Sequence, residues 1–68
     1  MNLFIETELE NDGRWIAAIP ELPGVALYGK TEEEAVRRVK ALAFRVLAEQ
    51  LENGLELPAG LSVFEVAA

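Results

Sequence analysis

Gly29-Lys30-Thr31-Glu32-Glu33-Glu34-Ala35 decides how this chain folds, because extended structure gives way to helix within it. Thr31 is a favourable helix N-cap, and Glu34 completes a capping box in which it reaches back to the amide of Thr31. Three glutamates in the first turn also suit the positive end of the helix dipole. The pattern predicts a helix from about Thr31 to Asn53, ended by Gly54 in a left-handed conformation.

The predicted helix carries one apolar stripe at three- and four-residue spacing, so one of its faces should pack on a core. The stripe consists of Ala35, Val36, Val39, Leu42, Ala43, Val46 and Leu47. A second apolar strip lies beside it, formed by Phe44 with Ala41, Ala48 and Leu51. This strip is either the broad edge of the core or a contact between subunits. Four basic residues on the helix share their surface with Glu34, Glu49 and Glu52, which predicts a salt-bridged solvent face with pairs such as Glu34–Arg38. Phosphate binding by Arg37, Arg38, Lys40 and Arg45 is the alternative.

The segments on either side of the helix alternate in the manner of strands. Residues 3–10 have period-2 patterning, the turn 11–13 tolerates positive φ, and residues 14–19 complete a hairpin. A Pro20–Gly24 loop, in which Pro23-Gly24 favours a type II turn, precedes a short strand over 25–28. A final strand is predicted over 61–66.

This order predicts a single α+β domain over residues 1–68, with two layers and a β-β-β-α-β sequence of elements. One helix should cover one face of a small, mainly antiparallel sheet. Because the helix returns the chain, the last strand should run in the direction of the first. If it lies beside the first strand, the sheet order is 3-2-1-4.

Composition excludes several kinds of site. The chain has no cysteine and no histidine, which removes Cys–His and Ser–His nucleophiles, the usual zinc sites and any disulfide. We therefore predict no catalytic residue, no bound metal and no cofactor. The net charge of −6 argues against nucleic-acid binding by this chain alone and suits a basic protein partner. No apolar run is long enough for a membrane span and no signal peptide is evident, so we expect a cytoplasmic protein.

Three carboxylates, Glu6, Glu8 and Glu10, share one face of the first strand. A solvated sheet face explains them most simply, since such a face needs polar residues. An acidic surface for a basic partner and a metal site are the alternatives. The spacing of i and i+2 on a strand, about 6.5–7 Å, is wide for two ligands of one ion.

Between Asp12 and Pro58 the chain resembles the antitoxin of HicA–HicB toxin–antitoxin systems, over about two-thirds of its length. The segments that carry the resemblance are the Asp12-Gly13 turn followed by Trp15, then Pro20-Glu21-Leu22-Pro23-Gly24-Val25, Gly29-Lys30-Thr31-Glu32-Glu33-Glu34-Ala35 and Gly54-Leu55-Glu56-Leu57-Pro58. The family-motif residues are expected to have structural or partner-contact roles: Trp15, Pro20, Pro23, Gly24, Gly29, Thr31, Glu34 and Ala35. Trp15 is expected in or at the edge of the core, with an interface anchor as the alternative.

The resemblance implies a truncated ribonuclease-H-like fold without activity of its own, which binds a small basic toxin that cleaves messenger RNA. Many family members add a C-terminal DNA-binding segment. This sequence ends directly after the predicted last strand, so operator binding is not expected of it.

Two rivals stay open. One is a stand-alone regulatory or ligand-binding oligomer, and the other, less favoured, is a metal-dependent nuclease on the same fold. Association into a homo-oligomer, a dimer first, is expected because a core of 68 residues is small. The candidate oligomer contacts are the third strand, with Val25 and Leu27, and the helix strip with Phe44, Ala48 and Leu51.

Overall fold

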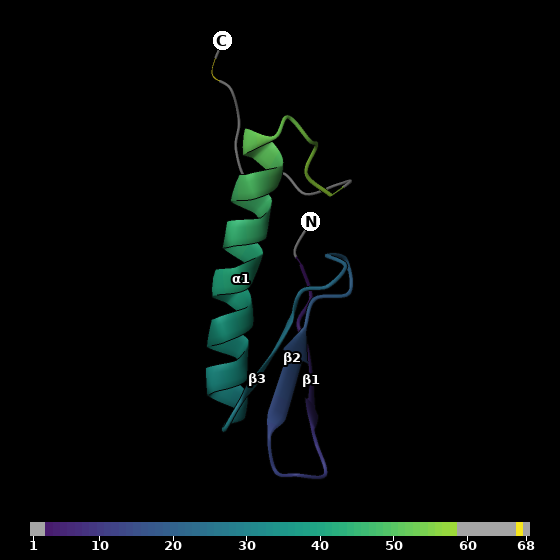
Figure 1. Cartoon of the computed structure of the whole chain (residues 1–68), viewed down its shortest axis with the longest axis vertical. Helices are drawn as coiled ribbons and strands as arrows, with labels where there is room; N and C mark the ends of the chain where they lie inside the picture. Colours follow the sequence, from purple (N-terminus) through teal and green to yellow (C-terminus); the bar gives the residue numbers. More distant parts are fainter. Residues whose placement is uncertain (1–2, 59–66, 68) are drawn as a thin grey trace.

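The computed structural model describes residues 3–58 and residue 67 (Figure 1). Its elements are β1 (Glu6–Leu9), β2 (Trp15–Ala18), β3 (Ala26–Gly29) and α1 (Glu32–Glu52). The strands form an antiparallel sheet in the order β1-β2-β3, and α1 packs against one face. The predicted α+β class is thus confirmed for this part of the chain. The strand predicted over 61–66 lies outside the described residues.

The turn between β1 and β2 sets the register of the hairpin. Gly13 has φ +89°, and its N–H donates to the carbonyl of Glu10 at 3.0 Å. The Glu10 N–H donates to the carbonyl of Arg14 at 2.7 Å and closes a three-residue loop. Pairing then runs from Leu9 opposite Trp15 to Glu6 opposite Ala18, so the regular strands are shorter than predicted.

The Pro20–Gly24 loop consists of two turns that place one of its side chains in the core. The N–H of Leu22 donates to the carbonyl of Ile19 at 2.9 Å, and the N–H of Val25 donates to that of Leu22 at 3.0 Å. Gly24, at φ +82°, occupies the third position of the second turn, as the predicted type II turn requires. Leu22 is 2% exposed, so the loop has a structural role.

The start of α1 differs from the predicted capping box in one bond. The Thr31 hydroxyl accepts from the N–H of Glu34 at 3.1 Å, as predicted. The Glu34 carboxylate accepts from the N–H of Lys30 at 3.2 Å, so the prediction that it returns to Thr31 was wrong by one residue. The helix ends as predicted, at Glu52 with Gly54 at φ +74°.

Gly29 allows the start of α1 to lie directly against the end of β3. A Cβ on Gly29 would stand 2.5 Å from the Ala35 nitrogen and 3.0 Å from its Cα. Real Cβ atoms do not approach backbone so closely, and neither backbone can move without displacing its element. The φ of Gly29 lies outside the left-handed region, so backbone conformation does not require glycine here. Glycine is required because the backbone of Ala35 lies so close.

The core lies between α1 and the sheet. Its buried members are Ala17, Ile19, Leu22, Val25, Ala35, Val39 and Ala43. The predicted apolar stripe of the helix supplies three of them and also the half-buried Val36, Leu42, Val46 and Leu47. Trp15 is half-buried against this cluster, which confirms its expected place at the core.

We predict that Gly29→Ala lowers the free energy of unfolding by about 1–3 kcal/mol, the range typical of an overpacked core, and toward its upper end. The cause is the collision of the new methyl group with the backbone of Ala35. Urea unfolding followed by far-UV circular dichroism measures it.

Gly54→Ala is the matched control, because it changes a glycine that has open space but a positive φ. This variant should lose about 1 kcal/mol through backbone strain alone. Equal losses in the two variants would contradict the close approach at Gly29.

Candidate functional site

The sheet has one covered face and one open face. Ala17 and Gly29 are buried on the side of α1. Alternation along the strands places the other set on the far side, where the described residues supply no covering element. This outer sheet face consists of Glu6, Glu8, Ile16, Ala18, Ala26 and Tyr28.

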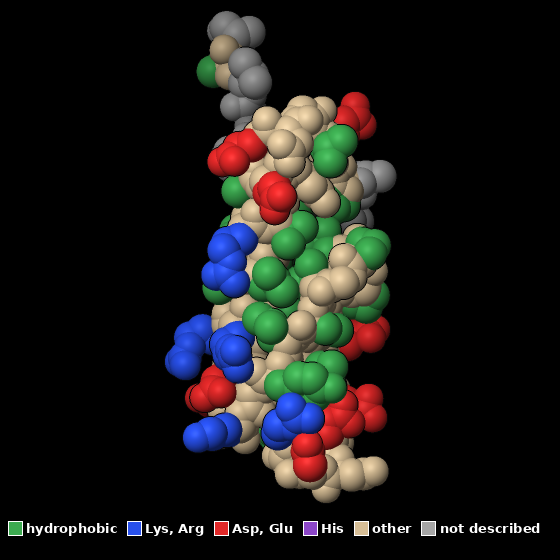
Figure 2. All heavy atoms as spheres, in the orientation of Figure 1, with side chains coloured by type: hydrophobic (Ala, Val, Ile, Leu, Met, Phe, Trp, Pro, Cys, Tyr) green, Lys and Arg blue, Asp and Glu red, His purple; other side chains and the backbone are tan. Residues whose placement is uncertain are grey.

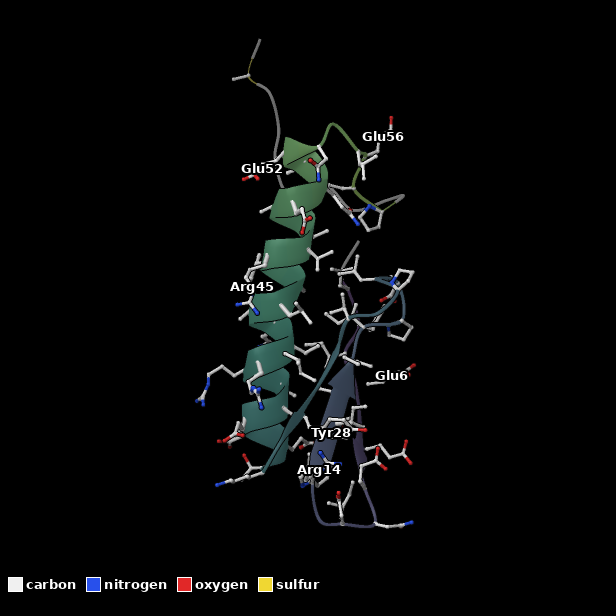
Figure 3. All side chains as sticks on the ribbon, viewed as in Figure 1. Glu6, Arg14, Tyr28, Arg45, Glu52 and Glu56 are labelled. Atoms are coloured by element: carbon white, nitrogen blue, oxygen red, sulfur yellow. The ribbon has the colours of Figure 1, made fainter. Side chains whose placement is uncertain are left out.

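The outer sheet face has an apolar centre and an acidic flank. Ile16, Ala18 and Ala26 form the centre, and the exposed Glu6 and Glu8 stand opposite Ala18 and Ile16 on β1. Figure 3 shows Glu6 pointing away from α1. The same flank continues to Phe4, whose residue is 68% exposed. Such a surface can contact a partner that has both apolar and basic side chains.

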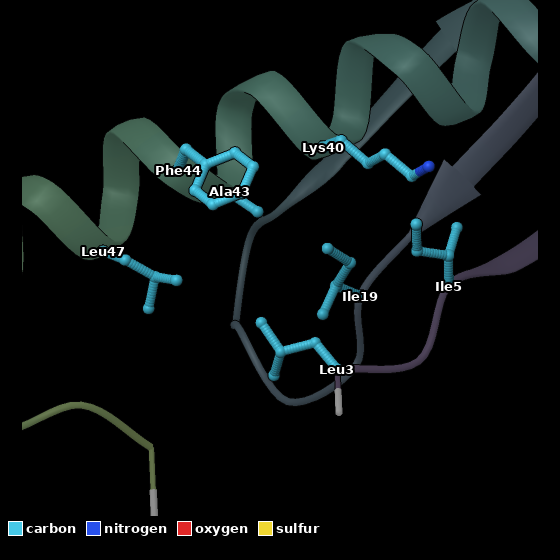
Figure 4. A pocket seen from close by; sticks show the side chains of 7 residues that line it. All are labelled: Leu3, Ile5, Ile19, Lys40, Ala43, Phe44 and Leu47. Carbon is cyan, nitrogen blue, oxygen red and sulfur yellow. The ribbon is translucent and has the colours of Figure 1, made fainter. Parts of the chain in front are cut away.

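An apolar groove lies on the covered side, between the start of β1 and one flank of α1 (Figure 4). Its volume is about 430 Å³, and its lining consists of Leu3, Ile5, Ile19, Lys40, Ala43, Phe44 and Leu47. α1 lies mainly over β3 and β2, which leaves the inner side of β1 partly uncovered. Phe44 is 72% exposed, so it does not belong to the core edge, the first of its two predicted roles.

The two free edges of the sheet differ. The N–H of Ile19 donates to the carbonyl of Val25 at 3.0 Å, so the backbone groups of Val25 point toward β2. Because this direction alternates along a strand, the backbone groups of Ala26 and Tyr28 point to the open side of β3. The Arg38 guanidinium donates to the Tyr28 carbonyl there at 2.6 Å. One acceptor of the β3 edge is therefore already used. At β1, the Glu10–Arg14 bond implies that Thr7 and Leu9 direct their backbone groups outward.

Fewer of the predicted side chains of the third strand are available for contact with a second copy of the chain. It begins at Ala26, and Val25 is 4% exposed with its side chain in the core. Leu27 is half-buried opposite Ala17. Both side chains belong to the covered side, so the exposed side chains of this strand are instead those of Ala26 and Tyr28. Ala48 and Leu51 on α1 are exposed and continue the strip that Phe44 begins.

A cluster of cations surrounds Tyr28 at the end of β3. The Arg14 guanidinium lies over the Tyr28 ring, 4.1 Å from its centroid, and Figure 3 shows the two side chains together. Its Nε contacts Asp12 Oδ2 at 2.7 Å. The backbone N–H and the side chain of Arg14 both donate to Asp12 and hold the pKa of that carboxyl below its usual value.

The prediction of salt bridges along the helix was wrong. Among the described residues, the ion pair present is Arg14–Asp12. Glu34 and Arg38 instead bond to backbone groups, of Lys30 and Tyr28 respectively. These are tertiary and capping contacts that an i,i+4 pattern does not reveal.

Pro20, Pro23 and Gly24 are exposed in the loop between β2 and β3. No group of three or more carboxylates within the described ranges could hold a metal ion, so Glu6, Glu8 and Glu10 do not converge. No helix in this part of the chain combines the length and the apolar character that crossing a bilayer requires.

Comparison of the chain with models of protein families, with curated proteins and with solved structures found no match. The resemblance to HicB antitoxins thus stays a prediction that depends on the motifs of the sequence. The candidate functional surfaces are the outer sheet face, the apolar groove and the cation cluster around Tyr28.

Proposed function

We propose that this chain is a non-enzymatic protein-binding domain similar to the HicB antitoxin, which blocks a small basic RNA-cleaving toxin by direct contact. The outer sheet face carries this proposal. There the exposed carboxylates of Glu6 and Glu8 flank an apolar centre around Ile16. Apolar contact would supply affinity, and the carboxylates would steer a basic partner into register. The absence of His and Cys from the whole chain fits a blocking role.

The finer fold belongs to the same proposal: a truncated ribonuclease-H-like domain in which residues 61–66 pair with the open edge of β1. Two observations within the described part support this order, 3-2-1-4. Thr7 and Leu9 direct backbone groups outward at that edge, and the apolar groove lies beside Leu3 and Ile5. The sequence of 61–66 is largely apolar, as an occupant of such a groove should be.

We predict that the amides of Thr7 and Leu9 exchange slowly with deuterium in the whole chain, because a fourth strand would bond to them. Val63→Pro should speed their exchange, since proline removes a donor and disrupts pairing. Ala67→Pro is the control and should change neither amide. Rapid exchange of both amides in the parent would contradict the strand order.

We expect the toxin to be a small basic protein encoded beside this chain. Glu6→Lys with Glu8→Lys should weaken its binding by at least about tenfold, mostly through slower association. Surface plasmon resonance measures both rates. Glu49→Lys with Glu52→Lys makes the same change of charge on exposed positions of α1 and is the matched control.

RNA cleavage by the neighbouring protein should stop at one equivalent of this chain. Equal weakening by both lysine pairs would show that only net charge matters, and would remove the outer sheet face from the proposal. RNA cleavage by this chain with Mg²⁺, lost in Glu8→Gln, would replace the proposal with the nuclease.

A second candidate function, a stand-alone regulatory or ligand-binding oligomer, is favoured by the exposed helix strip. Phe44, Ala48 and Leu51 form apolar surface on α1, and a small core gains stability by covering such surface. A second copy is the proposed occupant. Contact through α1 is favoured over extension of the sheet at β3, because Arg38 already occupies the Tyr28 carbonyl.

We predict a homodimer that Phe44→Glu converts to a monomer, because a buried carboxylate without a partner is costly. Light scattering at micromolar concentration measures the mass. Ala26→Pro is the control: Ala26 directs its N–H outward, so proline there blocks sheet extension without breaking a bond inside the sheet. Dissociation by Ala26→Pro alone would reverse the assignment, and a parent mass of about 7.5 kDa at all concentrations would end it.

A further inference from the structure

A small concavity lies where β3 meets the start of α1. Its volume is about 230 Å³, and its lining consists of Arg14, Tyr28, Gly29, Lys30, Glu34 and Arg38. The three cations come from three places in the sequence: the start of β2, the end of β3 and the second turn of α1. Figure 2 shows Lys and Arg side chains along one side and the lower end of this face, with carboxylates among them.

Two of the three cations are held in place by contacts that leave most of their donors unused. Arg14 lies over the Tyr28 ring, and its Nε donates to Asp12 at 2.7 Å. Arg38 donates through Nη1 to the Tyr28 carbonyl at 2.6 Å. A guanidinium has five N–H donors, so each keeps several for a ligand. Because both are already oriented, binding would cost little side-chain entropy.

The lining has an excess of positive charge, although the chain as a whole is at −6. Three cations face one carboxylate, that of Glu34, which accepts from the N–H of Lys30 at 3.2 Å. Asp12 offsets part of the charge of Arg14 from outside the lining, and Glu10 lies in the adjoining concavity that shares Arg14 and Tyr28. Within the described residues, Lys30 and Arg38 lie in no ion pair. The concavity therefore attracts an anion.

We propose that this concavity binds a phosphate group, free or as the ester of a small molecule. Guanidinium forks match the geometry of phosphate oxygens, and Lys30 adds a third cation. A nucleobase is not expected to stack on the face of the Tyr28 ring beside Arg14, because the guanidinium already covers it. Recognition is thus limited to the phosphate. This site does not depend on the proposed antitoxin function.

Titration of the ¹⁵N-labelled chain with inorganic phosphate, and separately with ribose 5-phosphate, at constant ionic strength tests the proposal. Both should shift the amide signals of Gly29 and Lys30 and the Nε–H signal of Arg38. They should saturate with Kd values within about threefold of each other, since the phosphate alone is recognised. Binding of ribose 5-phosphate only would overturn the proposal, because the sugar would then be the determinant.

Lys30→Gln should weaken phosphate binding by about fivefold, which is the effect of losing one ion-pair contact at an exposed site. Arg37→Gln and Arg45→Gln are matched controls, because they remove the same charge from α1 outside the lining. Unchanged binding in Lys30→Gln, or an equal loss in all three variants, would overturn the site. An octanucleotide RNA that binds more tightly than phosphate, with shifts along α1, would instead identify a nucleic-acid surface and reject the proposal.

Discussion

The contact between the backbone of Gly29 and that of Ala35 is the constraint on which the rest of the structure depends. Only a residue without a Cβ fits there, because any side chain would stand 2.5 Å from the Ala35 nitrogen. The contact brings the first turn of α1 onto the end of β3. From this fixed start, the apolar stripe turns Ala35, Val39 and Ala43 toward the sheet. The helix therefore lies over β3 and β2 rather than over the whole sheet.

That position makes the two edges of the sheet unequal. Near β3, α1 is close enough for Arg38 to reach the Tyr28 carbonyl, which occupies part of an edge that could otherwise pair with another strand. Near β1, the helix leaves the inner side partly open, and the apolar groove forms between Leu3 and Phe44. One close contact thus accounts for the partly occupied edge at β3, the open edge at β1 and the groove between the layers.

Local signals in the sequence were sufficient for the elements and their turns. Gly13, Gly24 and Gly54 each have the positive φ that a turn or a helix end requires, and Thr31 caps the helix as its neighbours predict. Contacts between distant residues could not be predicted in this way. Arg38 bonds to Tyr28, ten residues away, rather than to Glu34 on its own helix, because the position of β3 beside α1 is a property of the fold.

The candidate sites show the same division. The acidic flank of β1 could be predicted from period-2 alternation, since Glu6 and Glu8 share a face wherever the strand is placed. The cation cluster could not, because Arg14, Lys30 and Arg38 converge only when the hairpin and the helix are assembled. The role of Gly29 also depends on the assembled fold, because its missing side chain is needed only where the start of α1 lies against the end of β3.

Net charge describes this molecule poorly, because acidic and basic side chains are unevenly distributed over its surface. Adjacent strands lie about 4.8 Å apart, so β1 and β3 are separated by about 10 Å. At physiological ionic strength the Debye length is about 8 Å, and exposed charges at greater separations are largely screened from one another. The carboxylates beside β1 therefore contribute little to the potential around Arg38. A chain at −6 can in consequence present an acidic flank to a basic partner and a cationic concavity to an anion, each governed by its own neighbours.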